Sequence, residues 1–144
     1  MTNTYSNQNN IYRQKLADLI RRLSGEQLSQ PMEAGWTVAG VLAHLAFWDQ
    51  RALILLQKWQ HVGIGPSDVD TDIINDATRI LCVSLSPQVA AQLALTTAEA
   101  IDQEIERLAP DFLARVERDG KTVRLDRARH RETHIGEIEK ALGL

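Results

Sequence analysis

WTVAGVLAHLAFWDQRALILLQKWQ, residues 36–60, repeats apolar side chains at the three- and four-residue spacing of one helix face. Trp36 and Thr37 match the residue before a helix and its N-cap, and Trp36 is spaced to pack against Val41. We therefore predict a helix from about residue 38 to 60, ended by the glycine and proline of HVGIGP. Its buried face should consist of Val41, Leu42, Leu45, Trp48, Ala52, Leu55, Leu56 and Trp59.

Three further helices are predicted, one before this segment in the sequence and two after it. Apolar residues recur at helical spacing over 11–23, and a second stretch, 87–108, follows a Ser86 cap. A final helix should begin between residues 122 and 126 and run to the last residue, after a short connector DFLARVERDGKT. Residues 67–86 are predicted to be a crossover with a helical piece. The buried face of the 87–108 helix should contain Val89, Leu93, Thr97, Ala100, Ile101, Ile105 and Leu108.

These patterns predict an all-α protein, a four-helix bundle with one long connection between its second and third helices. No strand-like alternation competes with the helical spacing. The length of 144 residues suits a single domain over 1–144, in which the polar residues 1–10 are expected to be frayed. The helix lengths allow both parallel and antiparallel packing, so spacing alone does not choose a topology.

Composition narrows the class of protein. Hydrophobic residues make up 44% and charged residues 24%, as in ordinary globular domains, and the single Cys82 excludes an intrachain disulfide. The net charge of -3 gives no basic footprint for nucleic acid. The polar first residues lack the regions of a signal peptide, and we see no 18-residue apolar run. We expect a cytoplasmic protein with neither a nucleic-acid nor a membrane partner.

Histidines suggest a metal site. His130 and His134 stand four residues apart in the predicted last helix, so they share one face about 6 Å apart along the axis. The next residue at the same four-residue spacing is the apolar Ile138, so the two histidines should face inward. His44 could add a third imidazole from the helix at 38–60, and three nitrogens with an open position are typical of catalytic metal sites. The alternative is a pair of solvated histidines without a role.

Two blocks carry a family resemblance. GWTVAGVLAHLAFWDQR (35–51) and RHRETHIGEIEKAL (129–142) resemble the signature helices of the DinB-like superfamily, which includes mycothiol-dependent maleylpyruvate isomerase and bacillithiol transferase domains. The resemblance implies an up-down-down-up bundle, commonly dimeric, that holds a divalent metal. The ligands it implies are one histidine of the second helix and an HxxxH pair of the fourth. In this chain they are His44, His130 and His134.

Other metal bundles do not fit the sequence. A ferritin-like dimetal site needs Glu-x-x-His on two helices, and no glutamate here has a histidine three residues later. The zinc-protease motif HExxH fails because Arg131 follows His130.

Neutral imidazoles bind Zn²⁺, Ni²⁺ and similar ions, which can lower the pKa of a bound water to about 7 or hold a thiol as thiolate. We therefore hypothesise a metal-dependent enzyme that transfers a thiol or water to a small electrophile, as an S-transferase or a hydrolase. A low-molecular-weight thiol cofactor and a homodimer are expected from the resemblance alone. The alternative is a non-catalytic metal-binding or structural dimeric module.

Several residues could support such a site. A metal-bound histidine usually donates its other nitrogen to an oxygen acceptor, and the candidate acceptors are Asp49, Glu104 and Glu137. A basic cluster either binds carboxylates or forms a solvated face: Lys121, Arg124, Arg127, Arg129 and Arg131. Trp48 and Trp59 are predicted to be core, unless a cavity makes Trp48 a pocket wall. Cys82 should be buried and inert, and His61 exposed.

Overall fold

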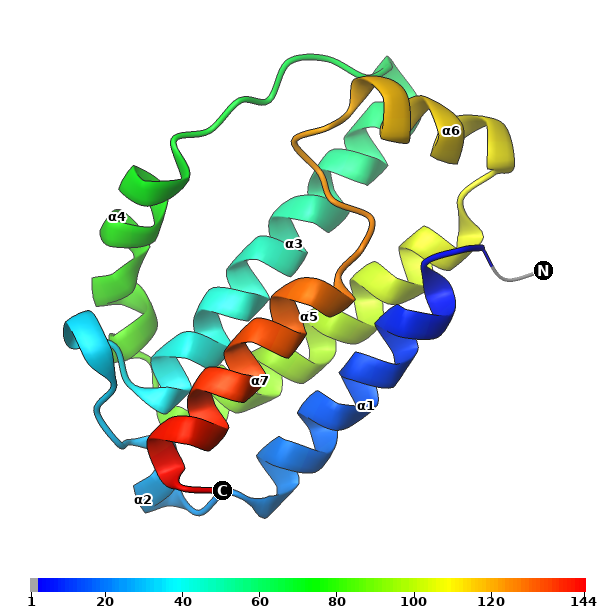
Figure 1. The fold of residues 1–144 in the computed structure, drawn as a ribbon. Helices are drawn as coiled ribbons and strands as arrows, with labels where there is room; N and C mark the ends of the chain where they lie inside the picture. The colour runs from blue at the N-terminus through cyan, green and yellow to red at the C-terminus, as the bar shows by residue number, and fades with distance from the viewer. Residues whose placement is uncertain (1–2) are drawn as a thin grey trace.

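The computed structural model describes residues 3–144, and over these residues the chain is all-helical, without a strand (Figure 1). Four longer helices contact one another: α3 lies against α5 and α7, and α1 lies against α5 and α7. Their bounds are α1 Ser6–Arg22, α3 Val38–Val62, α5 Pro87–Arg107 and α7 Ala128–Leu142. The shorter helices are α2 Gly25–Leu28, the 3-10 helix η1 Glu33–Gly35, α4 Thr71–Ser84 and α6 Pro110–Asp119.

Helix α3 forms as its sequence predicts. The Thr37 side chain accepts a hydrogen bond from the backbone N–H of Gly40 at 2.9 Å, which caps the first turn. The helix ends at Val62, where Gly63 takes a φ of 87° that favours glycine. Most residues of the predicted buried face are buried, whereas Trp48 and Leu55 are only half-buried.

By length and composition alone α3 could cross a membrane, contrary to our expectation that the chain has no such run. However, 61% of its most apolar window is buried inside the protein. Packing against α5, α4 and α7 therefore accounts for the apolar character of this helix.

The buried face of α5 differs from the prediction. Val89 and Leu93, expected inside, are 49% and 39% exposed, while Ala90, Ala94 and Ala98 are fully buried. The predicted face was chosen from the largest apolar side chains of the helix. Small side chains let two helices approach closely, and α5 makes its main contact with α3 through its alanines. Farther along the helix the prediction is confirmed for Ile101, Ile105 and Leu108.

The segment before the last helix folds more completely than predicted. The predicted connector, residues 111–122, contains most of a helix, α6, because Phe112 and Val116 stand four apart and are both buried. Gly120 then ends α6 where a Cβ would lie 2.7 Å from the Trp59 ring. The last helix starts at Ala128, slightly later than the range 122–126.

The chain start is also more ordered than expected. Residues 6–10, predicted to be frayed, form the first turns of α1, and Asn9 is 1% exposed. Ile11, predicted inside, is 37% exposed. Met1 and Thr2 also belong to the segment predicted to be frayed, and they lie outside the described residues.

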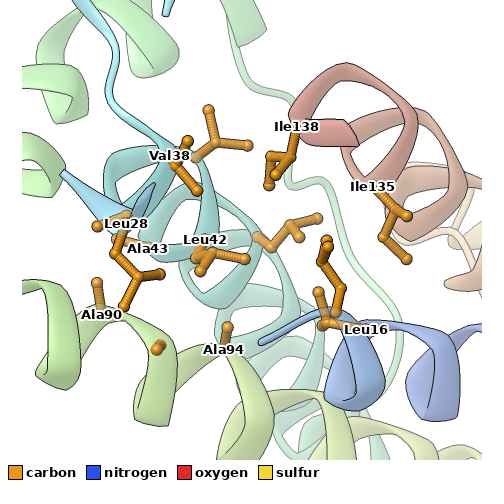
Figure 2. Packing of buried hydrophobic residues seen from close by; sticks show 14 of the residues in the cluster. Leu16, Leu28, Val38, Leu42, Ala43, Ala90, Ala94, Ile135 and Ile138 are labelled. Carbon is orange, nitrogen blue, oxygen red and sulfur yellow. The ribbon is translucent and has the colours of Figure 1, made fainter. Parts of the chain in front are cut away.

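The apolar core has two parts. One gathers residues of α1, α2, α3, α4, α5 and α7, and Figure 2 shows Leu16, Leu42, Ala94 and Ile138 pointing toward one another. The other lies around Trp59, with residues of α3, α5, α6 and the segment before α7. Along α3 the first part ends at Leu45 and the second begins at Ala52, and the buried Asp49 falls between them.

Candidate metal centre

The three predicted histidines meet. His44 comes from the first half of α3, and His130 and His134 from successive turns of α7. Each offers a ring nitrogen, and these nitrogens lie within 4.8 Å of one another. The ring centroids are 4.7–5.0 Å apart, and the rings cross at 72–81°. Such a cluster could hold a metal ion.

The nitrogen positions suit an ion. The Nε2 atoms of His44 and His130 are 3.1 Å apart. Two imidazole nitrogens that bind one tetrahedral zinc at about 2.05 Å would lie roughly 3.3 Å apart, so little movement is needed. Without an ion, the same contact is satisfied if one Nε2–H donates to the other Nε2.

Glu137 fixes the orientation of His134. One of its carboxylate oxygens lies 2.8 Å from Nδ1 of His134. An ionised carboxylate only accepts, so Nδ1 carries a hydrogen, and in the neutral ring Nε2 is the nitrogen free to bind a metal. Of the three predicted acceptors, Glu137 has this role. Asp49 pairs with arginines instead, and Glu104 bonds Gln60 and Arg107.

Burial keeps two of the three rings, those of His44 and His130, neutral. Burial, and secondarily the charge of His134, lower the pKa of His44 from 6.5 to about 4. Burial is also the main reason that the pKa of His130 falls to about 2, followed by His134 and His44. Neutral imidazole is the state that binds metal. In addition, Nδ1 of His44 is buried and has no hydrogen-bond partner within residues 3–144.

Behind the histidines lies an ionic layer that sequence reasoning missed, made of Arg13, Asp49, Asp102, Arg127 and Arg131. Arg131 is 1% exposed and bonds Asp102 through both terminal nitrogens, at 2.8 and 2.9 Å. Arg127 donates from Nε to Asp49 at 2.8 Å, and Arg13 reaches Asp102 at 2.9 Å. These ion pairs connect α1, α3 and α5 to the start of α7.

This layer corrects the prediction of one basic cluster. Arg127 and Arg131 do not belong to a solvated face, because both are buried and paired with aspartates. Only Lys121, Arg124 and Arg129 are exposed as a surface group. Buried charges need partners, and no pattern in the segment 121–131 shows that those partners are on α3 and α5.

Asn9 holds the start of α7. Its Oδ1 accepts from the backbone N–H groups of Arg127 and Ala128 at 2.9 and 3.0 Å, and its Nδ2 donates to the carbonyl of Leu125 at 3.0 Å. Helix α7 has no side-chain cap from its own N-cap residue, so Asn9 supplies that function from α1. This residue places the turn that carries His130.

The histidines open onto a cleft of about 1190 Å³. Trp36 and Trp48 line it, and Trp48 donates from Nε1 to Oδ1 of Asn75 on α4 at 3.0 Å. Because a cavity is present and Trp48 is half-buried, this residue is a wall of the cleft as well as part of the packing. A small molecule could therefore reach the histidines.

Two other residues match their predictions. Cys82 is buried, and burial raises the pKa of its thiol, which disfavours the reactive thiolate. His61 is exposed at the end of α3, far along the helix from His44.

Comparison with known families gives one match. The profile of the mycothiol maleylpyruvate isomerase N-terminal domain matches residues 11–135, which include His44, His130 and His134. Comparison with the curated proteins and with the solved structures gave no match.

Proposed function

The chain belongs to the mycothiol maleylpyruvate isomerase N-terminal domain family, a DinB-like family, and from this we propose that it is a divalent-metal-dependent enzyme. The observation that carries the proposal is the convergence of His44, His130 and His134 at the wall of an open cleft. Three nitrogens leave coordination positions for a substrate, as catalytic sites require.

The ligands that we propose are Nε2 of each histidine. Glu137 holds His134 in the required tautomer, and burial keeps His44 and His130 unprotonated. Zinc or nickel suits an all-imidazole site. When bound, such an ion supplies Lewis acidity that favours the anionic form of a thiol or water near neutral pH.

We favour thiol transfer over hydrolysis because of the family, with a low-molecular-weight thiol as the cofactor. The thiol loses its proton to solvent, and its sulfur forms a bond to an electrophilic carbon of a small substrate. In an addition, the electron pair displaced from that carbon takes up a proton. In a substitution, it departs with the leaving group. The cleft, with Trp36 and Trp48 in its walls, positions both reactants.

We also propose that the chain is a single domain over 1–144 and that its four longer helices form an up-down-down-up bundle. In support, α3 and α5 run in one direction in Figure 1, and α1 and α7 run in the opposite direction. The long connection through α4 joins the two parallel helices α3 and α5, as that topology requires.

A homodimer in the cytoplasm is the proposed state of the protein. Apolar side chains stay exposed on α4 and α5, among them Ile80, Leu81 and Val89, and a second copy would cover them. The net charge of -3 supports small-molecule rather than nucleic-acid partners, and the burial of α3 supports the absence of a membrane partner.

One observation favours a second candidate, a non-catalytic structural module. The 3.1 Å contact between His44 and His130 can be satisfied as a hydrogen bond without an ion. In that case the triad would be a polar contact between α3 and α7, and metal would not be needed.

Metal analysis of protein purified without an affinity tag separates the two candidates. The enzyme proposal expects about one divalent ion per chain, retained in His61→Ala and lost in His130→Ala. His61 is a matched control because it is exposed and outside the cluster. An unchanged metal content in His130→Ala would refute the site. Thiol-dependent turnover with added Zn²⁺ or Ni²⁺ then tests catalysis, and a bound metal without turnover would favour the module.

A further inference from the structure

Arg51 is a half-buried cation of the cleft without an anionic partner among the described residues. It lines the same cavity as the histidines, and no carboxylate lies within ion-pair distance of it in the part of the chain that the structure describes. The other buried arginines nearby are neutralised: Arg127 by Asp49, and Arg131 by Asp49 and Asp102. A half-buried guanidinium in a metal cleft therefore keeps a net positive charge.

The guanidinium is held in place by neutral groups. Nη1 donates to the carbonyl of Thr122 at 3.1 Å, and Nη2 donates to the carbonyl of Ser67 at 2.8 Å. The group also lies 5.6 Å from the ring centroid of Trp48. Because a guanidinium has five N–H donors, three remain after these two bonds. Burial and the charge of Arg127 lower the pKa of Arg51, as expected for a cation without a counter-ion.

Helix geometry sets the distance to the histidines. Arg51 follows His44 by seven residues, which is two turns, so both lie on one face of α3 about 10 Å apart along the axis. Trp48 stands between them, one turn beyond His44, and also lines the cleft. The wall thus presents, in order, an imidazole nitrogen, an aromatic side chain and a guanidinium.

We propose that Arg51 binds the carboxylate of an elongated ligand whose reactive end lies at the histidines. This deepens the proposed function, on which it rests, because it gives the thiol or the electrophile an acid group about 10 Å from the reacting atom. A carboxylate suits this guanidinium, because its two oxygens can accept two parallel N–H···O hydrogen bonds from the remaining donors.

A purely structural role for Arg51 is the rival explanation. Its two carbonyl bonds join the segment between α3 and α4 to the segment before α7, where Ser67 and Thr122 also contact each other through their hydroxyls. Loss of such a bridge would lower the melting temperature of the protein. It would not change the ratio of the affinities for an acid and for its neutral amide.

The test uses cobalt-loaded protein and a series of mercaptoalkanoates of increasing chain length, each compared with its primary amide. Thiol binding is followed by the sulfur-to-cobalt absorption band. We expect each acid of sufficient length to bind about ten-fold more tightly than its amide, the value of one charge-assisted hydrogen bond, with the preference greatest near a 10 Å span and absent in acids that are too short to reach Arg51 yet too long to chelate the cobalt. Equal binding of acid and amide at every length would overturn the proposal.

Variants assign the preference to one residue. In Arg51→Gln the ratio of acid to amide affinity should fall to about one, and because it is a ratio within one variant, partial unfolding does not imitate it. In Arg124→Gln, which removes an exposed cation of the same cleft, the ratio should persist. A preference that survives Arg51→Gln would overturn the assignment. If the glutamine variant does not fold, the chain-length series on the unsubstituted protein decides alone.

Failure of the metal site gives a different result. If no thiol produces the absorption band, the proposed function is wrong, and the carboxylate site is then tested on metal-free protein. There, quenching of tryptophan fluorescence by an alkanoate but not by its alkanamide supports a carboxylate at Arg51 beside Trp48. No difference between the two probes refutes it.

Discussion

Two faces of α7 differ sharply, although neighbouring residues form them. His130 faces the cleft, where burial keeps its ring neutral, whereas Arg131 points into the interior and is 1% exposed with its charge intact. The cleft face lines an open cavity, so solvent and small molecules can reach it. The interior face is a fixed ionic layer with aspartates from α3 and α5.

The difference shows how an all-helical protein can build a site from a short helix. Arg131 occupies its position only if α7 has one rotation about its axis, and that rotation turns His130 and His134 toward α3. The ionic layer therefore positions the histidines.

Replacing Arg131 should give the largest effect. Arg131→Met leaves Asp102 and Asp49 with a buried charge and fewer partners, which is expected to destabilise the protein by about 3–5 kcal/mol. Urea unfolding followed by circular dichroism measures it. Arg129→Met is the control, because that side chain is 79% exposed and its loss should change stability by under about 0.5 kcal/mol. Similar values for the two variants would mean that the ionic layer does not anchor α7.

The cap from α1 should give the next largest effect. Asn9→Ala leaves two backbone N–H groups at the start of α7 and one carbonyl without their partner, so a loss of about 2 kcal/mol in unfolding free energy is expected. Asn10→Ala is the matched control, since Asn10 is exposed and bonds only Arg13 among the described residues. If both variants melt alike, Asn9 is not the cap of the helix that carries both faces.

The helices could be predicted where large apolar side chains mark the buried face. In α3, residues such as Leu42, Leu45 and Leu56 give that signal, and the helix begins and ends close to where its cap and glycine place it. The first half of the buried face of α5 was predicted wrongly, because small residues such as Ala94 form it instead of large apolar ones. Helix α6 was missed because only Phe112 and Val116 are fully buried in a segment of which half the residues are charged.

The histidines of the site could be predicted, and their surroundings could not. The i, i+4 spacing of His130 and His134 is a local pattern, and the family resemblance adds His44. By contrast, Asn9 and Ala128 are 119 residues apart, and Arg51 and Thr122 are 71 apart. Such contacts depend on how the helices pack, and nothing in the sequence near either partner indicates the other.

The cleft face should show the smallest of the three effects, and it should appear in metal binding rather than in folding. Glu137→Ala removes the acceptor that orients His134, which is expected to weaken metal affinity about ten-fold, equal to about 1.4 kcal/mol. The unfolding free energy of the metal-free protein should change by less than about 0.5 kcal/mol, because Glu137 is exposed. Competition with a chromophoric chelator measures the affinity.

Glu132→Ala is the control for this prediction, since Glu132 is an exposed glutamate of α7 that has no contact with the histidines in the described part of the chain. Its metal affinity should equal that of the unsubstituted protein. A Glu137→Ala variant that loses stability but not metal affinity would reverse the contrast between the two faces. The carboxylate would then hold the helix instead of orienting a ligand, and the interior and cleft faces of α7 would no longer have separate roles.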